Sequence, residues 1–167
     1  MARTPQEIFS HHGREFIENA ASSLGLPFAQ LAKGGKKKGT PFLRKPPKMA
    51  GRGGWIKSNK HMSPEARKYQ AKVSKYPGYE YRLNGVDFDG FRGGALLDAK
   101  GPGYLQLMTS NGTAQSLWNK LSAQATRQRR AAGPSGRIVW HVAEEEAVPM
   151  FRRVGQRSGI IVVHTAP

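Results

Sequence analysis

The stretch from Asn84 to Gly103 constrains the fold more than any other part of the chain. It contains two short strand-like segments, Val86–Phe91 and Ala95–Lys100, separated by the pair Gly93-Gly94. Two adjacent glycines both accept positive φ, which favours a two-residue β-hairpin turn. The stretch therefore predicts a hairpin, and the length of the turn sets its register.

Counting outward from the turn pairs Arg92 with Ala95, Asp89 with Asp98, and Asp87 with Lys100. Because side chains alternate along a strand, the three aspartates and Lys100 are expected on one face. The other face would carry Phe88, Leu97 and Ala99, which suits a core. Directly opposed carboxylates repel each other unless a cation compensates them. Lys100 supplies part of that charge, and a hard divalent ion such as Mg²⁺ would supply the rest.

The residues alone leave two interpretations of this face open. One is a metal site, and the other is an ordinary solvated charged face, since a D-x-K triplet occurs by chance in many chains. The context favours a site, because Lys100 ends an apolar run that begins at Ala95, and lysine is rarely buried without a partner.

Asp89, followed by Asp98-x-Lys100 at the end of the next strand, resembles the PD-(D/E)xK nuclease signature of the restriction-endonuclease fold. More narrowly, four blocks within about residues 63–167 resemble the fifth restriction-endonuclease-fold family of bacterial polymorphic toxins. They are ARKYQ at 66–70, NGV at 84–86 with FDG at 88–90, LLDAKGPGY at 96–104, and WH at 140–141 with AEEE at 143–146. The resemblance implies a toxic domain of a secreted antibacterial effector, including type VI secretion cargo, together with a cognate immunity protein.

The resemblance also implies roles for individual residues. Asp89, Asp98 and the Ala99 carbonyl would bind one or two Mg²⁺ (or Mn²⁺) ions, and Lys100 would orient water or offset developing charge. A glutamine on the helix after the hairpin commonly lies near the metal in this superfamily, so Gln124 is the candidate, with Gln128 behind it. Further candidates are the reserve acids Glu80 and Asp87, then Tyr69 and Gln70 from the first block, for which no role is derived, and His141, which ranks below the carboxylates.

The remaining elements are predicted from local signals. Helices are expected from Ser63 to about Ser74 and over Thr113–Ala131, and strands over Tyr79–Leu83, Arg137–Val142 and Gly159–His164. The acids Glu144, Glu145 and Glu146 favour a helix N-terminus, in a helix that Pro149 would kink or shorten. Helices alternating with strands predict an α/β fold, a restriction-endonuclease-like α/β/α sandwich around a mixed sheet.

Three segments are expected along the chain: an N-terminal helical segment over 1–25, a basic Gly/Pro-rich linker or arm over 26–62, and the nuclease toxin domain over 63–167. Apolar residues in the arm are too sparse to fold it alone. Its lysines Lys36, Lys37 and Lys38 would contact phosphates, as would Arg127 and Arg130 near the end of the second helix. A solvated linker explains the arm equally well.

Charge points to the partner. The chain has 27 Lys and Arg against 11 Asp and Glu, a net charge of +16, which implies a polyanion and suggests an acidic immunity protein. Cysteine is absent, which removes thiolate zinc sites and cysteine nucleophiles. No apolar run suits membrane insertion and no signal-peptide pattern opens the chain. We expect export by a non-classical route, through type VI or a similar system with a delivery protein, and action in the target-cell cytoplasm.

The leading hypothesis is an Mg²⁺-dependent endonuclease that hydrolyses DNA with little sequence specificity. A second hypothesis is a non-catalytic, basic nucleic-acid-binding protein whose binding would survive metal chelation and replacement of Asp98. A third is the same fold cutting RNA, because metal and phosphate chemistry are common to both nucleic acids.

Overall fold

The computed structural model describes residues 45–46, 53–110 and 113–167. The predicted helix within 1–25 and the lysines Lys36, Lys37 and Lys38 lie outside these residues. The elements are β1 (Gly53–Lys57), α2 (Pro64–Ser74), β2 (Tyr79–Leu83), β3 (Val86–Phe88), β4 (Gly90–Arg92), β5 (Ala95–Lys100), α3 (Tyr104–Thr109), α4 (Ala114–Ala132), β6 (Arg137–Val142), the 3-10 turn η1 (Glu145–Ala147), α5 (Val148–Gln156) and β7 (Ile161–His164).

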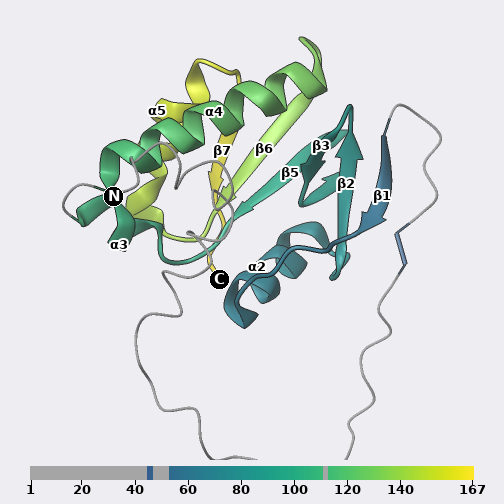
Figure 1. Cartoon of the computed structure of the whole chain (residues 1–167), viewed down its shortest axis with the longest axis horizontal. Coiled ribbons are helices and arrows are strands. Elements are labelled where there is room, and N and C mark those ends of the chain that lie inside the picture. The colour runs from purple at the N-terminus through teal and green to yellow at the C-terminus, as the bar shows by residue number, and fades with distance from the viewer. Residues whose placement is uncertain (1–44, 47–52, 111–112) are drawn as a thin grey trace, which may run out of the picture.

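The architecture is an α/β/α sandwich around a mixed sheet, as predicted (Figure 1). The main sheet has the order β4-β5-β6-β7, with β4 antiparallel to β5 and the other two pairs parallel. α4 and α5 cover one face, and α2 packs against the other. A second, antiparallel sheet of order β1-β2-β3 flanks β4.

The predicted hairpin forms only next to its turn. Arg92 pairs with Ala95, and Gly93 and Gly94 have φ of 56° and 75°, values that suit glycine. The predicted strand Val86–Phe91, however, is broken at Asp89. β3 pairs with β2 in the second sheet and only β4 pairs with β5, so Asp87 lies opposite Arg82 and not opposite Lys100.

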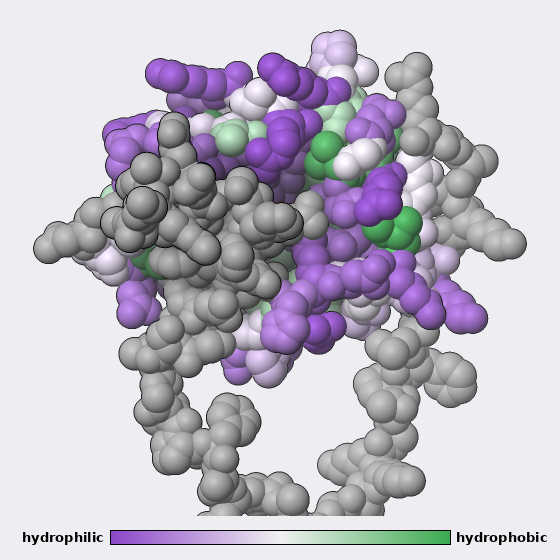
Figure 2. All heavy atoms as spheres, viewed as in Figure 1, coloured by the Kyte–Doolittle hydropathy of each residue, from purple (hydrophilic) through white to green (hydrophobic). Residues whose placement is uncertain are grey.

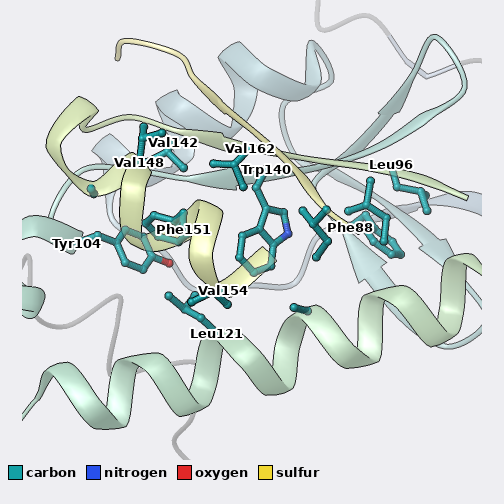
Figure 3. Packing of buried hydrophobic residues seen from close by; sticks show 14 of the residues in the cluster. Phe88, Leu96, Tyr104, Leu121, Trp140, Val142, Val148, Phe151, Val154 and Val162 are labelled. Carbon is teal, nitrogen blue, oxygen red and sulfur yellow. The ribbon is translucent and has the colours of Figure 1, made fainter. Parts of the chain in front are cut away.

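The break also corrects the predicted faces of the hairpin. Phe88 packs with Leu96 and Trp140 in the large core between the sheet and α4 and α5, as Figure 3 shows. Leu97 and Ala99 lie on the opposite face, against α2. Phe88 therefore does not share a face with Leu97 and Ala99, contrary to the prediction.

Local signals placed most other elements well. Ser63 caps α2, its hydroxyl accepting a hydrogen bond of 3.2 Å from the Ala66 amide. Pro149 was predicted to kink or shorten its helix. It lies in the first turn of α5, where a missing amide costs no intrahelical hydrogen bond, and the helix begins only at Val148, after the three acids. β1 was not predicted: it begins at Gly53, inside the segment assigned to the basic arm, and pairs along its whole length with β2.

Figure 2 shows a face of the molecule that is largely hydrophilic over its described part, with small hydrophobic areas. In the part of the chain that the structure describes, no helix is both long enough and apolar enough to span a membrane.

Candidate active site

Asp98 and Lys100 project from β5 towards α4 and form a closed network with Gln124. The Lys100 Nζ lies 2.7 Å from Asp98 Oδ1 and donates a hydrogen bond of 2.7 Å to Gln124 Oε1. Gln124 Nε2 donates to Asp98 Oδ2 at 2.9 Å. Asp98 is 4 % exposed and Lys100 2 %, so each buried charge is compensated by the other and by an amide.

Gln128 lies one turn after Gln124 on the same face of α4 and is 1 % exposed. Its Nε2 donates to Asp98 Oδ2, while its Oε1 accepts a hydrogen bond of 2.7 Å from the Trp140 indole. The Trp140 ring in turn lies 4.5 Å from the Lys100 ammonium, a cation–π contact. The Asp98 carboxylate is thus held from α4 and β6 together.

Asp89 directly precedes β4, where the backbone pairing between β4 and β5 ends. Its side-chain carboxylate pairs with β5 at the position where a further strand residue would otherwise pair. Its Oδ2 accepts a hydrogen bond of 2.7 Å from the Ala99 amide, and its Oδ1 accepts one of 2.9 Å from Gln70 Nε2. The amide and carbonyl of one strand residue point to the same edge, so the Ala99 carbonyl also points to the Asp89 side of β5.

Glu80 and Asp89 share a cation that the sequence did not single out. The Lys60 ammonium forms an ion pair with Glu80 Oε1 and lies 3.5 Å from Asp89 Oδ1. Burial alone lowers the Lys60 pKa, but the charges of Asp89 and Glu80 outweigh it and raise the pKa above its ordinary value. In the sequence, Lys60 is one of many lysines in the basic tract, so no local signal distinguishes it.

Three other candidates lie outside this cluster. Asp87 forms a bidentate pair with Arg82, at 2.6 and 3.0 Å, in the second sheet. The Tyr69 hydroxyl donates to the Thr165 carbonyl at 2.8 Å, which ties α2 to the segment after β7. His141 Nδ1 lies 2.9 Å from Thr165 Oγ1, and burial, helped by the charge of Arg92, lowers the His141 pKa.

The three acids were predicted at the N-terminus of the helix that contains Pro149, but α5 begins only at Val148, and Glu144 contacts the N-terminus of α3 instead. The Glu144 carboxylate accepts hydrogen bonds from the Gly103 amide at 3.1 Å and the Leu105 amide at 2.9 Å. These are amides at the N-terminus of α3, where negative charge is stabilised. Glu144 therefore holds the segment that follows Lys100, and it does so from the loop after β6.

The donor set suits a hard divalent ion. Within the described ranges, no three or more histidine, cysteine, aspartate or glutamate side chains gather to hold a metal ion. Mg²⁺, however, is often bound through only one or two carboxylates, and keeps waters or takes substrate phosphates for the rest. Asp89, Asp98 and the Ala99 carbonyl fit that pattern, and the Lys60 ammonium lies 3.5 Å from Asp89 Oδ1.

Arginines at the end of α4 divide into two groups. Arg129 is structural: its guanidinium donates four hydrogen bonds of 2.7–3.0 Å to backbone carbonyls, two in the turn after α4 and two in the turn before β7. Arg127 and Arg130 are exposed, and their contact with phosphates stays a prediction.

The fold and this cluster define a domain of the restriction-endonuclease fold, with two carboxylates and a lysine at the end of a central strand. Residues 66–145 match the model of the family described as restriction endonuclease fold toxin 5, which supports a restriction-endonuclease-fold toxin domain in this part of the chain. The matched segment holds three of the four blocks completely, and the fourth except its final glutamate. No curated protein and no solved structure shows significant similarity to the chain.

Proposed function

We propose that the domain is a metal-dependent endonuclease that hydrolyses phosphodiester bonds of DNA with little sequence specificity. The observation that carries the proposal is the union of Asp98, Lys100 and Gln124 in one network, with Asp89 hydrogen-bonded to the intervening Ala99. Two carboxylates and a lysine around one strand end suit metal-assisted phosphodiester hydrolysis, because the carboxylates can hold the ion and the lysine can offset negative charge.

Asp89, Asp98 and the Ala99 carbonyl would hold Mg²⁺ or Mn²⁺. A divalent ion bound there lowers the pKa of a coordinated water and stabilises charge on the scissile phosphate. Hydrogen bonds already orient both carboxylates: Gln70 and the Ala99 amide donate to Asp89, and Gln128 donates to Asp98. Such outer partners of ligating carboxylates fix their geometry.

Lys100 would orient the attacking water or offset the charge that develops on the phosphate. Its ammonium is compact and has three donors, of which Asp98 and Gln124 take two in this structure. Gln124, partly exposed beside it, would position water or phosphate. Arg127 and Arg130 would bind the phosphate backbone of the nucleic acid, since phosphate contacts position a duplex without reading its sequence.

The toxin family supports a wider role for the protein. We propose an antibacterial effector that leaves the producing cell by a type VI or similar route and acts in the cytoplasm of a target cell. A chain with a net charge of +16 would be held by an acidic immunity protein in the producing cell. A delivery protein would be a further partner.

The test is cleavage of supercoiled plasmid and of structured RNA by purified protein, with Mg²⁺, with Mn²⁺ and with EDTA. Metal-dependent nicking of the plasmid is the expected result. Cleavage of RNA alone would replace the proposed substrate and keep the chemistry. Retardation of either nucleic acid, unchanged by EDTA and without cleavage, would show a non-catalytic binding protein and overturn the proposal.

A further inference from the structure

Lys60 is the one member of the cluster that comes from outside the segment matched by the family model. It follows β1 in a loop anchored by the Ser58 amide, which donates to the Gly78 carbonyl at 2.9 Å. The Lys60 amide donates to the Ser58 hydroxyl at 3.4 Å. The backbone segment that carries Lys60 is therefore itself hydrogen-bonded to the turn before β2.

The electrostatics explain why a cation lies here. The Glu80 and Asp89 side chains are 3 % and 11 % exposed and carry like charges on neighbouring elements. Two buried carboxylates beside the same ammonium repel each other, and that ammonium offsets their charge. Lys60 compensates both, whereas Lys100 is occupied by Asp98 and Gln124 on the α4 side of β5.

A divalent ion on Asp89 would meet that ammonium. The Lys60 Nζ is 3.5 Å from Asp89 Oδ1, so it lies against the carboxylate that would hold the metal ion. Repulsion between a divalent ion and an ammonium at such a distance is large inside a protein. The Lys60 side chain is 23 % exposed on a flexible four-carbon stem, so it can turn outwards.

We infer that Lys60 is a positioning residue that competes with the divalent ion for Asp89 and thereby sets the metal affinity of the site. In the absence of metal it holds Asp89 and Glu80 together; metal binding displaces it from Asp89. The inference rests on the proposed function in one respect, that Asp89 is a metal ligand. It assigns Glu80 to the same site as the carboxylate that keeps Lys60 close.

The test is calorimetric titration of the full chain with Mn²⁺ and with Ca²⁺, without nucleic acid. Lys60→Met keeps the length of the side chain and removes its charge. Lys57→Met is the matched control, because Lys57 ends β1 nearby, is exposed, and has no place in the site. We expect Lys60→Met to bind both ions about fivefold or more tightly than wild type, and Lys57→Met to change affinity by less than about twofold.

Equal gains in the two variants would mean general electrostatics, and weaker binding by Lys60→Met would mean that the lysine only organises the carboxylates. Either result overturns the inference. The proposed function stays intact as long as the wild-type protein binds the ions and Asp89→Asn does not. If wild type and Lys60→Met bind neither ion, both proposals fail.

Two safeguards keep the test decisive if Lys60→Met does not fold. Lys60→Gln retains a hydrogen-bond donor for Glu80 and is expected to show the same gain in metal affinity. In wild type, the side-chain ¹⁵N signal of Lys60 should shift when Ca²⁺ is added. A signal that stays unchanged at saturating Ca²⁺ contradicts displacement.

Discussion

The Asp89 carboxylate accepts a hydrogen bond of 2.7 Å from the Ala99 amide, so it pairs with the edge of β5 beyond the point where β4 ends. This single contact joins the loop between the two sheets to the strand that carries Asp98 and Lys100. It holds the Asp89 carboxylate at the edge of β5, whereas Asp98 projects from the same strand towards α4. In the proposed function both carboxylates would hold the ion, and hydrogen bonds from Gln70, Gln124 and Gln128 orient them.

The neighbours Tyr69 and Gln70 should respond differently to substitution. Tyr69→Phe removes the hydrogen bond to Thr165 and should lower the free energy of unfolding by about 0.5–1.5 kcal/mol without changing cleavage by the folded protein. Gln70→Met removes a donor from Asp89 and should reduce cleavage about tenfold or more. Urea unfolding and plasmid cleavage, measured on both variants, check this. Equal loss of cleavage in the two would contradict separate roles.

Gln128 should matter for stability as well as for the site. Gln128→Met keeps the volume of the side chain but leaves the Trp140 indole without its acceptor and takes one donor from Asp98. We expect the free energy of unfolding to fall by about 1–3 kcal/mol. Gln115→Met, on the exposed face of the same helix, is the control and should change it by less than about 0.5 kcal/mol. A Gln128→Met protein as stable as wild type would show that the buried bridge contributes nothing.

The arginines at the end of α4 should separate DNA binding from folding. Replacing Arg127 and Arg130 together by glutamine should weaken binding to DNA, in a catalytically inactive background, uniformly across sequences. It should also reduce the slope of log K against log salt by about 0.9 for each phosphate that the variant no longer neutralises. Arg129→Gln should instead lower thermal stability, because it removes four bonds to two turns. An unchanged salt slope in the double variant would show that neither arginine neutralises a DNA phosphate.

His141 should make folding sensitive to mild acid. Burial and the Arg92 charge lower its pKa in the folded state, against a partly opposing effect of Asp98, so the unfolded chain binds the proton more readily. The stability that this contributes is complete above the unfolded pKa of about 6.5 and is lost as pH falls towards the folded pKa. The urea midpoint of wild type should drop between about pH 7.5 and about pH 5.5, and His141→Gln should drop less. An equal drop in both proteins would assign the effect to other groups.

Local signals sufficed for elements whose stability is decided nearby. Ser63 and the glycine pair at 93–94 predicted their elements, and the helix expected over Thr113–Ala131 forms as α4. α3 was missed because its N-terminus lacks a capping side chain of its own: Gly103 occupies the N-cap with φ of 107°, and Glu144 supplies the acceptor from 41 residues away. Short-range sequence patterns cannot predict a contact between residues so far apart in the chain.

The register counted from the turn is correct where β4 pairs with β5, but the predicted pairs beyond Gly90 failed for a related reason. Counting outward from the turn assumes a continuous strand, and the strand breaks at Asp89. Gly90 allows the break to be packed, since a Cβ there would lie 3.0 Å from the Ser74 Cβ of α2. Lys60 and Gln70 reach Asp89 from elements that precede the hairpin, so they could not be found by counting within it.

Whether Asp98 is essential for cleavage is decided by plasmid cutting with Mg²⁺ by wild type, Asp98→Asn and Asp87→Asn. Both substitutions replace one carboxylate by an amide, but Asp87 pairs with Arg82 in the second sheet. Matching circular dichroism spectra and cooperative melting would show that all three proteins are folded. We predict that Asp87→Asn cuts like wild type and that Asp98→Asn loses about a hundredfold or more of the cleavage rate. A folded Asp98→Asn protein that cuts as fast as wild type would contradict a metal-dependent nuclease centred on Asp98.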